Sequence, residues 1–283
     1  MPPLVLLVAL VALVAACNTP APPPAPPASV PAPDTTARLP YDLAQPDARF
    51  ALDERLREIS GLGWTDTGRL VAVQDEDGDV FELDPESGAV LSVARFANNG
   101  DYEGIEVVDS VTWIVESDGD LYPFDGTTEA NKIETELRRS NDVEGLAFDP
   151  TENRLLLACK EDPGGDLSGV RAIYAYDLAS GRLGPDPVYT LDRATLDPGG
   201  ASFKPSGLAV HPETGEIYVV SGVRQALVVL SPTGDLRAAV QLPAPLYPQP
   251  EGIAFAPDGT LYISNEGTGG PATLLRFLPH DLP

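Results

Sequence analysis

The sequence predicts an all-β protein with a β-propeller fold. A short phrase, Ser or Glu followed by Gly and then Leu or Ile, begins at five places: Ser60, Glu103, Glu144, Ser206 and Glu251. Successive copies begin 43, 41, 62 and 45 residues apart. After each copy, the chain continues as an apolar stretch, a turn and a second apolar stretch. A repeat of about forty residues that holds several short strands is typical of a propeller blade.

Each repeat is expected to contain further strands. Third strands are expected at residues 79–84, 120–125, 172–177, 226–231 and 273–278. Fourth strands are expected in four repeats, at residues 90–96, 133–138, 188–191 and 236–242. Gly-containing turns such as Pro85–Gly88 separate these segments, because Gly, Pro, Asp and Ser favour tight turns.

The fifth repeat lacks a fourth strand, since the chain ends at Pro283. Arg49–Leu52 precedes the first copy of the phrase much as Ala94–Phe96 precedes the second, so it can supply the missing strand. Pairing of the two ends would close the ring and remove exposed sheet edges. We therefore expect five four-stranded blades closed by an N-terminal strand. Six blades, the alternative, would require a degenerate blade within residues 160–203.

The N-terminal region is predicted to direct export and to tether the protein. Residues 4–16 are all apolar, and this run spans roughly 20 Å as a helix, less than a bilayer core of about 30 Å. It ends in Val14-Ala15-Ala16-Cys17, which resembles a bacterial lipobox with Cys17 as the lipidated residue. Residues 18–33 contain eight prolines and favour extended polyproline II. We expect a signal peptide at 1–16, lipidated Cys17 and a tether at 17–40, and the propeller at 41–283. An ordinary signal peptide with an incidental Cys is the alternative.

The charge of the chain limits its partners. Its 18 basic and 43 acidic residues give a formal net charge of −25, which repels nucleic acids and anionic membrane surfaces. We therefore expect no nucleic-acid partner, and membrane contact only through the lipid anchor. The expected location is a bacterial cell-envelope membrane, where a monomer would bind an unidentified small molecule or an envelope protein.

Several stretches of the sequence resemble the SdiA-regulated domain family. They are residues 58–62, 75–78, 100–105, 116–122, 143–147, 155–161, 247–255 and 263–267. The resemblance covers about residues 41–278. It implies a β-propeller, often tethered to a membrane, but no settled activity. Calcium-binding propeller lactonases and esterase-like propellers are more distantly similar.

Carboxylates recur at two positions of the predicted repeat. Glu103, Glu144 and Glu251 precede the repeated glycine, and Asp75, Glu116 and Glu266 follow second strands. If the first strand leaves one face of the ring and the second strand returns to it, both sets lie on that face. Oxygen ligands suit Ca²⁺, and a cation would relieve the repulsion between converging carboxylates. We therefore predict a metal site at these six residues. Alternatively, each Glu caps its own turn or pairs with Lys160, Lys204 or Arg224.

The sequence offers little support for nucleophilic catalysis. The two histidines, His211 and His280, are expected away from the acidic face, and Cys159 lies in an apolar run. No catalytic residue is assigned, and a protein without catalytic activity is favoured over an enzyme. The expected function is a ligand- or partner-binding module of the cell envelope, with a cation on its acidic face. A calcium-dependent esterase, lactonase or phosphodiesterase-like hydrolase is the alternative, because a metal ion can activate water without a histidine.

Overall fold

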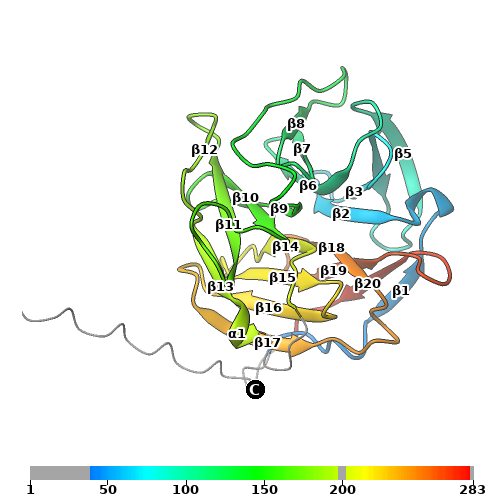
Figure 1. Cartoon of the computed structure of the whole chain (residues 1–283). Coiled ribbons are helices and arrows are strands. Elements are labelled where there is room, and N and C mark those ends of the chain that lie inside the picture. The colour runs from blue at the N-terminus through cyan, green and yellow to red at the C-terminus, as the bar shows by residue number, and fades with distance from the viewer. Residues whose placement is uncertain (1–38, 197–201, 281–283) are drawn as a thin grey trace, which may run out of the picture. The chain divides into compact units, whose positions relative to one another are not determined.

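Five antiparallel sheets follow one another along the chain in the computed structural model, which describes residues 39–196 and 202–280 (Figure 1). The predicted signal peptide, Cys17 and the tether up to residue 38 lie outside the described residues. Among the residues described, no helix is both long and apolar enough to cross a bilayer.

Each sheet forms one blade. Blade 1 contains β2 (Ile59–Trp64), β3 (Leu70–Gln74), β4 (Asp79–Leu83) and β5 (Val90–Arg95). Blade 2 contains β6 (Tyr102–Val108), β7 (Val111–Glu116) and β8 (Leu121–Phe124). Blade 3 contains β9 (Val143–Asp149), β10 (Arg154–Cys159), β11 (Val170–Asp177), β12 (Arg182–Leu183) and β13 (Tyr189–Asp192), which is followed by α1 (Arg193–Leu196). Blade 4 contains β14 (Gly207–Val210), β15 (Ile217–Ser221), β16 (Ala226–Leu230) and β17 (Leu236–Gln241). Blade 5 contains β18 (Pro250–Phe255), β19 (Leu261–Asn265), β20 (Thr273–Phe277) and β1 (Ala48–Ala51).

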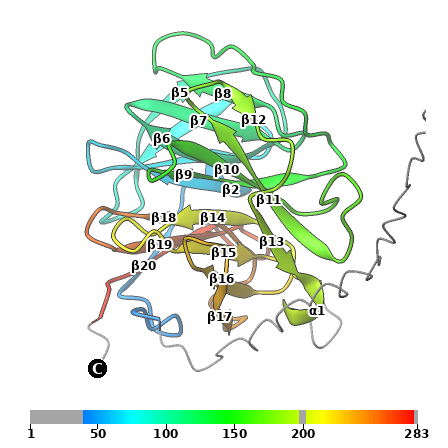
Figure 2. The same ribbon diagram turned by 90° about the vertical axis from the view of Figure 1, so that its left-hand side faces the viewer.

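The first strands of the blades contact one another in a closed cycle, in the order β2, β6, β9, β14, β18 and back to β2. These five strands lie around the centre of the propeller in Figure 1, whereas β5 and β17 lie at its rim. Figure 2 shows one blade from the centre outward as β14, β15, β16 and β17. The closed cycle confirms the prediction of five blades.

The repeated glycine permits this close approach. A Cβ atom at Gly61 would lie 2.9 Å from the backbone nitrogen of Ile105 in the next blade. At Gly104 it would lie 2.9 Å from the backbone nitrogen of Leu146, one blade further on. Real Cβ atoms essentially never approach backbone atoms so closely. Glycine therefore occurs once per blade because the inner strands pack backbone to backbone.

The hydrophobic core is divided among the five interfaces between neighbouring blades. One cluster joins Tyr218 of blade 4 to Phe255 and Leu275 of blade 5, and another joins Val73 of blade 1 to Ile114 of blade 2. The other three interfaces hold equivalent clusters. Both faces of the inner strands are thus buried, which explains why these strands are apolar without strict alternation.

The N-terminal strand closes the ring as predicted. Strand β1 pairs antiparallel with β20 from Ala48 opposite Arg276 to Ala51 opposite Thr273. The segment before β1 also packs on the propeller: Tyr41 and Leu43 are buried, and the Tyr41 hydroxyl donates to the carbonyl of Gly259 at 2.7 Å. The end of the last blade is therefore held by the beginning of the domain.

Two blades depart from the expected four strands. The strand predicted at residues 133–138 is wrong, since only one bridge, between Leu121 and Ile133, is formed there. Thr135 explains the difference: its backbone N–H donates to Asp120 Oδ1 at 2.9 Å and its hydroxyl to the Gly119 carbonyl at 3.0 Å. The hydrogen bonds of this segment thus go to the β7–β8 turn. In blade 3, both β12 and β13 pair with the long strand β11.

Candidate functional site

The residue before each repeated glycine, here called the marker residue, lies at one edge of the ring, where an inner strand begins and its neighbour ends. In blade 2, Tyr102 at the start of β6 is opposite Glu116 at the end of β7, and the register then shifts so that Gly104 is opposite Val115. Glu103 is therefore the extra residue of a β-bulge. Similar shifts occur around Ser60 in blade 1 and Glu144 in blade 3. A bulge re-aims the side chain of the extra residue.

Serine and glutamate markers have different contacts. The Ser60 hydroxyl donates to the carbonyl of Tyr102 at 2.6 Å, and the Ser206 hydroxyl donates to the carbonyl of Pro250 at 2.7 Å. Each of these carbonyls belongs to the next blade and precedes its marker. The two serines are buried and therefore join neighbouring blades instead of offering free ligand oxygens.

The glutamate markers gather with two other predicted site residues into an axial cluster, defined as Asp75, Glu103, Glu144, Glu251 and Glu266. Charges within the cluster affect the ionisation of its members: Glu144 and Asp75 act on Glu103, Glu144 and Glu266 act on Glu251, and Asp75 acts on Glu266. Glu144 and Glu251 are 6% and 8% exposed. Glu103 and Glu144 also line the axial cavity, whose volume of ≈ 10 Å³ matches about one water molecule.

Burial is the main reason that the cluster resists ionisation. It raises the pKa of Glu103, Glu144 and Glu251 above the usual value for Glu, with Glu144 the leading charged neighbour of the other two. Burial and the charge of Asp75 raise the pKa of Glu266 to about 7. Burial and the charge of Glu58 raise the pKa of Asp75 to about 6. The cluster thus combines desolvated carboxyl groups with mutual repulsion, which a cation would relieve.

Lys160 brings a positive charge to this cluster. It follows β10 directly, and its ammonium group forms an ion pair with Glu144. Its charge also lowers the pKa of Glu103, Glu251 and Glu266. For Glu144, the alternative of a lysine partner is therefore correct. Within the described part of the chain, no ion pair joins the other four members of the axial cluster to a lysine.

Glu116 lies in a different group of charges. It accepts hydrogen bonds from the Tyr122 hydroxyl at 2.7 Å and from Lys132 Nζ at 2.9 Å. Lys132 also forms ion pairs with Asp118 and Asp120 at 3.4 and 2.9 Å. The structure thus places Glu116 with the lysine of the segment after β8, and these partners do not include the axial cluster.

Three acidic residues near the cluster were not predicted. Glu58 and Asp101 raise the pKa of Asp75, and Asp142 raises that of Glu144. Each lies two residues before a marker, a repeat position that Lys204 and Gln249 occupy in the remaining blades. Gln249 donates to Glu266 Oε2 at 2.7 Å. Alignment of the five repeats at this second position would have identified these residues from the sequence.

The cluster does not form a ready coordination shell. Within residues 39–196 and 202–280, no group of three or more His, Cys, Asp or Glu side chains is arranged to hold a metal ion. Calcium binding therefore stays a prediction, with oxygen ligands from Glu103, Glu144, Glu251, Asp75 and Glu266 available to it, and Glu116 held by Lys132.

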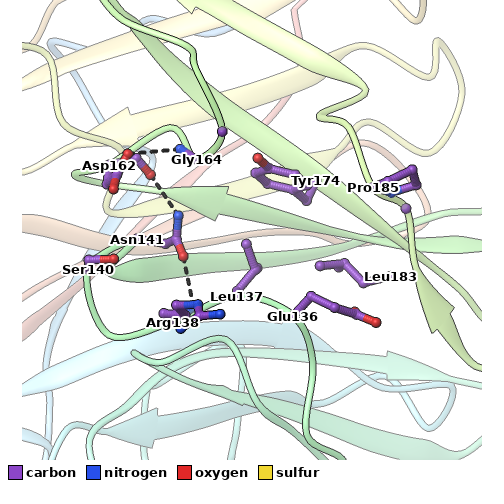
Figure 3. A pocket seen from close by; sticks show the side chains of 12 residues that line it. Glu136, Leu137, Arg138, Ser140, Asn141, Asp162, Gly164, Tyr174, Leu183 and Pro185 are labelled. Atoms are coloured by element: carbon purple, nitrogen blue, oxygen red, sulfur yellow. Dashed lines mark hydrogen bonds between the residues drawn. The ribbon is translucent and has the colours of Figure 1, made fainter.

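A larger pocket of ≈ 400 Å³ lies beside blade 3 (Figure 3). Asn141 links two of its walls, because it accepts from the Arg138 backbone N–H at 2.8 Å and donates to the Asp162 carbonyl at 2.9 Å. Leu137 and Tyr174 add apolar surface. The pocket contains no member of the axial cluster.

Neither His211 nor the buried thiol of Cys159 is available for acid–base chemistry at the axial cluster. His211 lies in the β14–β15 turn, at the opposite end of the inner strands, where it is buried against Tyr41 and Phe255. Burial lowers its pKa. Cys159 is fully buried, and burial raises the pKa of its thiol to about 12. Neither group is placed as a nucleophile or base for the axial cluster.

Solved structures of known proteins share this fold. The glutaminyl cyclase of Myxococcus xanthus aligns with a TM-score of 0.58 at 14% identity, over 84% of this chain and 97% of that one. A luciferin-regenerating enzyme gives 0.54 at 13% identity, over 84% and 96%. The gluconolactonase of Xanthomonas campestris gives 0.52 at 16% identity, over 78% and 72%. At these identities, the likeness concerns the fold alone.

Sequence comparison is more specific. No curated protein sequence matches the chain. The profile of the SdiA-regulated family, however, matches residues 43–277, from the buried segment before β1 to the end of β20. The match includes every blade and every member of the axial cluster. The chain therefore belongs to the SdiA-regulated family.

Proposed function

We propose that this protein is an exported, lipid-anchored propeller that binds a divalent cation, Ca²⁺ first among them, at the axial cluster. The observation that carries the proposal is the gathering of five carboxylates around one end of the axis, where burial and mutual repulsion raise their pKa. A bound divalent ion reverses this penalty, because it favours the ionised form of every carboxylate around it.

The cation would organise a binding face. Carboxylates from blades 1, 2, 3 and 5 meet there, so one ion would link elements that are far apart in the sequence. An ion held by protein oxygens on one side can offer its open positions to a ligand. A small molecule or an envelope protein with its own oxygen donors would suit such a face, whereas the net charge of −25 disfavours nucleic acids.

Thermal unfolding of chelated protein tests the proposal. Adding Ca²⁺ should raise the melting temperature, because an ion that binds only the folded state stabilises it by about 2.7 kcal/mol at a hundredfold excess over its Kd. The combined substitution Glu103→Gln, Glu144→Gln and Glu251→Gln should abolish this rise.

The matched control changes the same number of charges elsewhere. Glu129, Glu134 and Glu213 are exposed, so their replacement by Gln should leave the Ca²⁺ response intact. An unchanged melting curve of the wild-type protein in millimolar Ca²⁺, with no metal in the purified sample, would rule out the cation site.

A calcium-dependent hydrolase is the second candidate. The gluconolactonase among the structural neighbours shares the fold at 16% identity, and a metal ion held by Glu103, Glu144 and Glu251 would supply an activated water. Because His211 lies at the other end of the inner strands, the ion itself would have to activate this water. Turnover of ester, lactone or phosphodiester substrates that requires Ca²⁺ and is lost in the triple Gln variant would favour the enzyme. Calcium binding without turnover would favour the binding module.

A further inference from the structure

The pocket beside blade 3 is built by segments that depart from the regular blade repeat. One wall, residues 136–141, belongs to the segment after β8, where blade 2 lacks its expected fourth strand. The other two walls, residues 162–165 and 183–185, lie in the longest interval between markers, the 62 residues from Glu144 to Ser206. Added segments in a repeat protein often form its binding surface, and loops on a rigid scaffold commonly carry function. This pocket is therefore a second candidate for ligand binding.

Hydrogen bonds and a glycine hold the walls of the pocket in place. Asn141, which joins the first wall to the second, is only 6% exposed. The Tyr174 hydroxyl donates to the carbonyl of Pro163 at 2.8 Å. Gly164 has a φ of 81°, and a Cβ atom there would lie 2.6 Å from the Tyr174 hydroxyl oxygen, so glycine is needed for this loop to pack on the ring. The pocket is thus preformed, as most sites for small molecules are.

The inner surface of the pocket is apolar. Leu137 and Tyr174 line it and belong to the hydrophobic cluster between blades 2 and 3, and Leu183 packs against the same cluster. The volume of ≈ 400 Å³ is within the range of small-molecule sites, about 300–1,000 Å³. An apolar group of a ligand would therefore be buried against side chains of the core.

Charged side chains of both signs line the same pocket (Figure 3). They are Glu136, Arg138 and Asp162, and all three are exposed. Within the described part of the chain, none of the three takes part in an ion pair, whereas the neighbouring Arg139 pairs with Asp101 at 3.4 Å. The chain has 43 acidic and 18 basic residues, so the free guanidinium group of Arg138 does not reflect a shortage of carboxylates. The pocket thus offers one positive and two negative groups to a ligand.

We propose that this pocket binds a small zwitterion with an apolar body, that is, an apolar amino acid or a short peptide of such residues. The guanidinium group of Arg138 would bind the carboxylate, for which its planar pair of N–H donors is suited. Glu136 and Asp162 would attract the ammonium group, and the apolar side chain would pack on Leu137 and Tyr174. A purely anionic ligand would be repelled by the two carboxylates, and a purely cationic one by Arg138. This site is separate from the axial cluster and does not depend on a bound cation.

Calorimetric titration of the full-length protein with L-leucine and with L-leucyl-L-leucine tests the proposal. At least one of them should bind, and the tighter of the two identifies the free amino acid or the peptide as the better ligand. L-Leucinamide lacks the carboxylate, and N-acetyl-L-leucine lacks the ammonium group. Each should bind about tenfold more weakly than L-leucine, because one charged hydrogen bond is lost. Glycine, which has both charges but no apolar body, should also bind more weakly.

Variants assign the binding to the pocket. Arg138→Gln should weaken binding of L-leucine about tenfold and should make the affinities for L-leucine and L-leucinamide nearly equal. Arg139→Gln, the matched control, removes the same charge one residue further on, where the arginine pairs with Asp101, and should leave both affinities unchanged. Glu136→Gln combined with Asp162→Asn should remove the preference for L-leucine over N-acetyl-L-leucine.

The opposite results would overturn the proposal. The pocket is not a zwitterion site if neither L-leucine nor L-leucyl-L-leucine binds at millimolar concentration, or if the two blocked compounds bind as tightly as L-leucine. Equal affinity of the wild-type protein and Arg138→Gln for L-leucine would place the binding elsewhere on the molecule. The triple Gln variant of the glutamate markers should bind L-leucine like the wild-type protein, because no marker lines the pocket. The outcome is therefore independent of the proposed cation site.

Discussion

The marker position shows how one repeat position can serve two purposes. In blades 1 and 4 it is a serine whose hydroxyl joins one blade to the next. In blades 2, 3 and 5 it is a glutamate whose carboxyl group enters the axial cluster. A hydrogen bond from a buried serine contributes roughly 1 kcal/mol, whereas burial of a carboxylate costs free energy that a partner such as Lys160 only partly offsets, so the two kinds of marker contribute differently to stability.

The raised pKa values predict an unusual pH dependence for the metal-free protein. A carboxyl group with a raised pKa holds its proton more tightly in the folded state. Its contribution to stability is therefore greatest below the unfolded pKa, and is lost as the pH rises through the folded pKa. The free energy of unfolding should fall as the pH rises from about 4.5, the ordinary Glu value, through about 7, the pKa of Glu266. Urea unfolding in chelator at several pH values measures this decline.

The triple Gln variant at Glu103, Glu144 and Glu251 supplies the control. Its stability should decline less steeply over the same range, because three of the groups no longer titrate. A remaining slope is expected, since burial also raises the pKa of Glu106 to about 7 and that of Asp75 to about 6. Parallel profiles for the wild-type protein and the variant would contradict the assignment of the raised pKa values to the markers.

At the scale of the elements, strand β1 is important for the stability of the last blade, although it contains only four residues. Strand β1 is the only partner of the outer edge of β20 among the described strands, and Tyr41 and Leu43 anchor the segment before it. Tyr247 donates from its hydroxyl to the Leu43 carbonyl at 2.9 Å. The two ends of the domain therefore stabilise each other.

Truncation tests this closure. Deletion of residues 1–38 should leave the melting temperature nearly unchanged, because every described contact is retained. Deletion of residues 1–53 removes β1, Tyr41 and Leu43, so it should unfold or aggregate the protein by exposing the edge of β20. Circular dichroism melts and size-exclusion chromatography of both forms measure the difference. Equal stability of the two truncated proteins would show that β1 is not needed to close the ring.

At the scale of the whole molecule, the segment before β1 and the axial cluster lie at opposite ends of the inner strand β18. The Tyr41 hydroxyl contacts Gly259 in the β18–β19 turn, whereas Glu251 of the axial cluster lies at the other end of β18. The described part of the chain therefore enters the folded domain away from the cluster.

The proposed lipid anchor at Cys17 predicts that the protein is found in the membrane fraction. Cys17→Ala should shift the protein from the membrane fraction to the soluble or mislocalised fraction, because acyl chains contribute about 0.8 kcal/mol per buried CH₂ group and two chains suffice for stable anchoring. Cell fractionation followed by immunoblotting measures the shift. Mass spectrometry provides an independent check, and an unmodified Cys17 in protein purified from membranes would refute the anchor.

The sequence alone was sufficient for the blade count, the closing strand and the edge at which the glutamates gather. These properties follow from features that can be read within each repeat. A glycine at one position per repeat marks the approach of the inner strands, and a missing last strand implies a borrowed one. The period of the repeat then assigns equivalent residues to equivalent places, and this equivalence is enough to place Glu103, Glu144 and Glu251 around one axis.

Only the tertiary structure decided how the charges are paired. Lys160 and Lys204 are equally plausible partners in the sequence, yet only Lys160 neutralises the axial cluster. Glu116 is the last residue of β7 and lies opposite Tyr102, whereas Asp75 and Glu266 come one residue later in their repeats. Lys132 pairs with Glu116 in a separate group because the segment after β8 returns to the β7–β8 turn. An ion pair depends on the distance between two segments that are not a fixed number of residues apart in the chain. The repeat assigns each residue to a position in the ring, but it does not determine these distances.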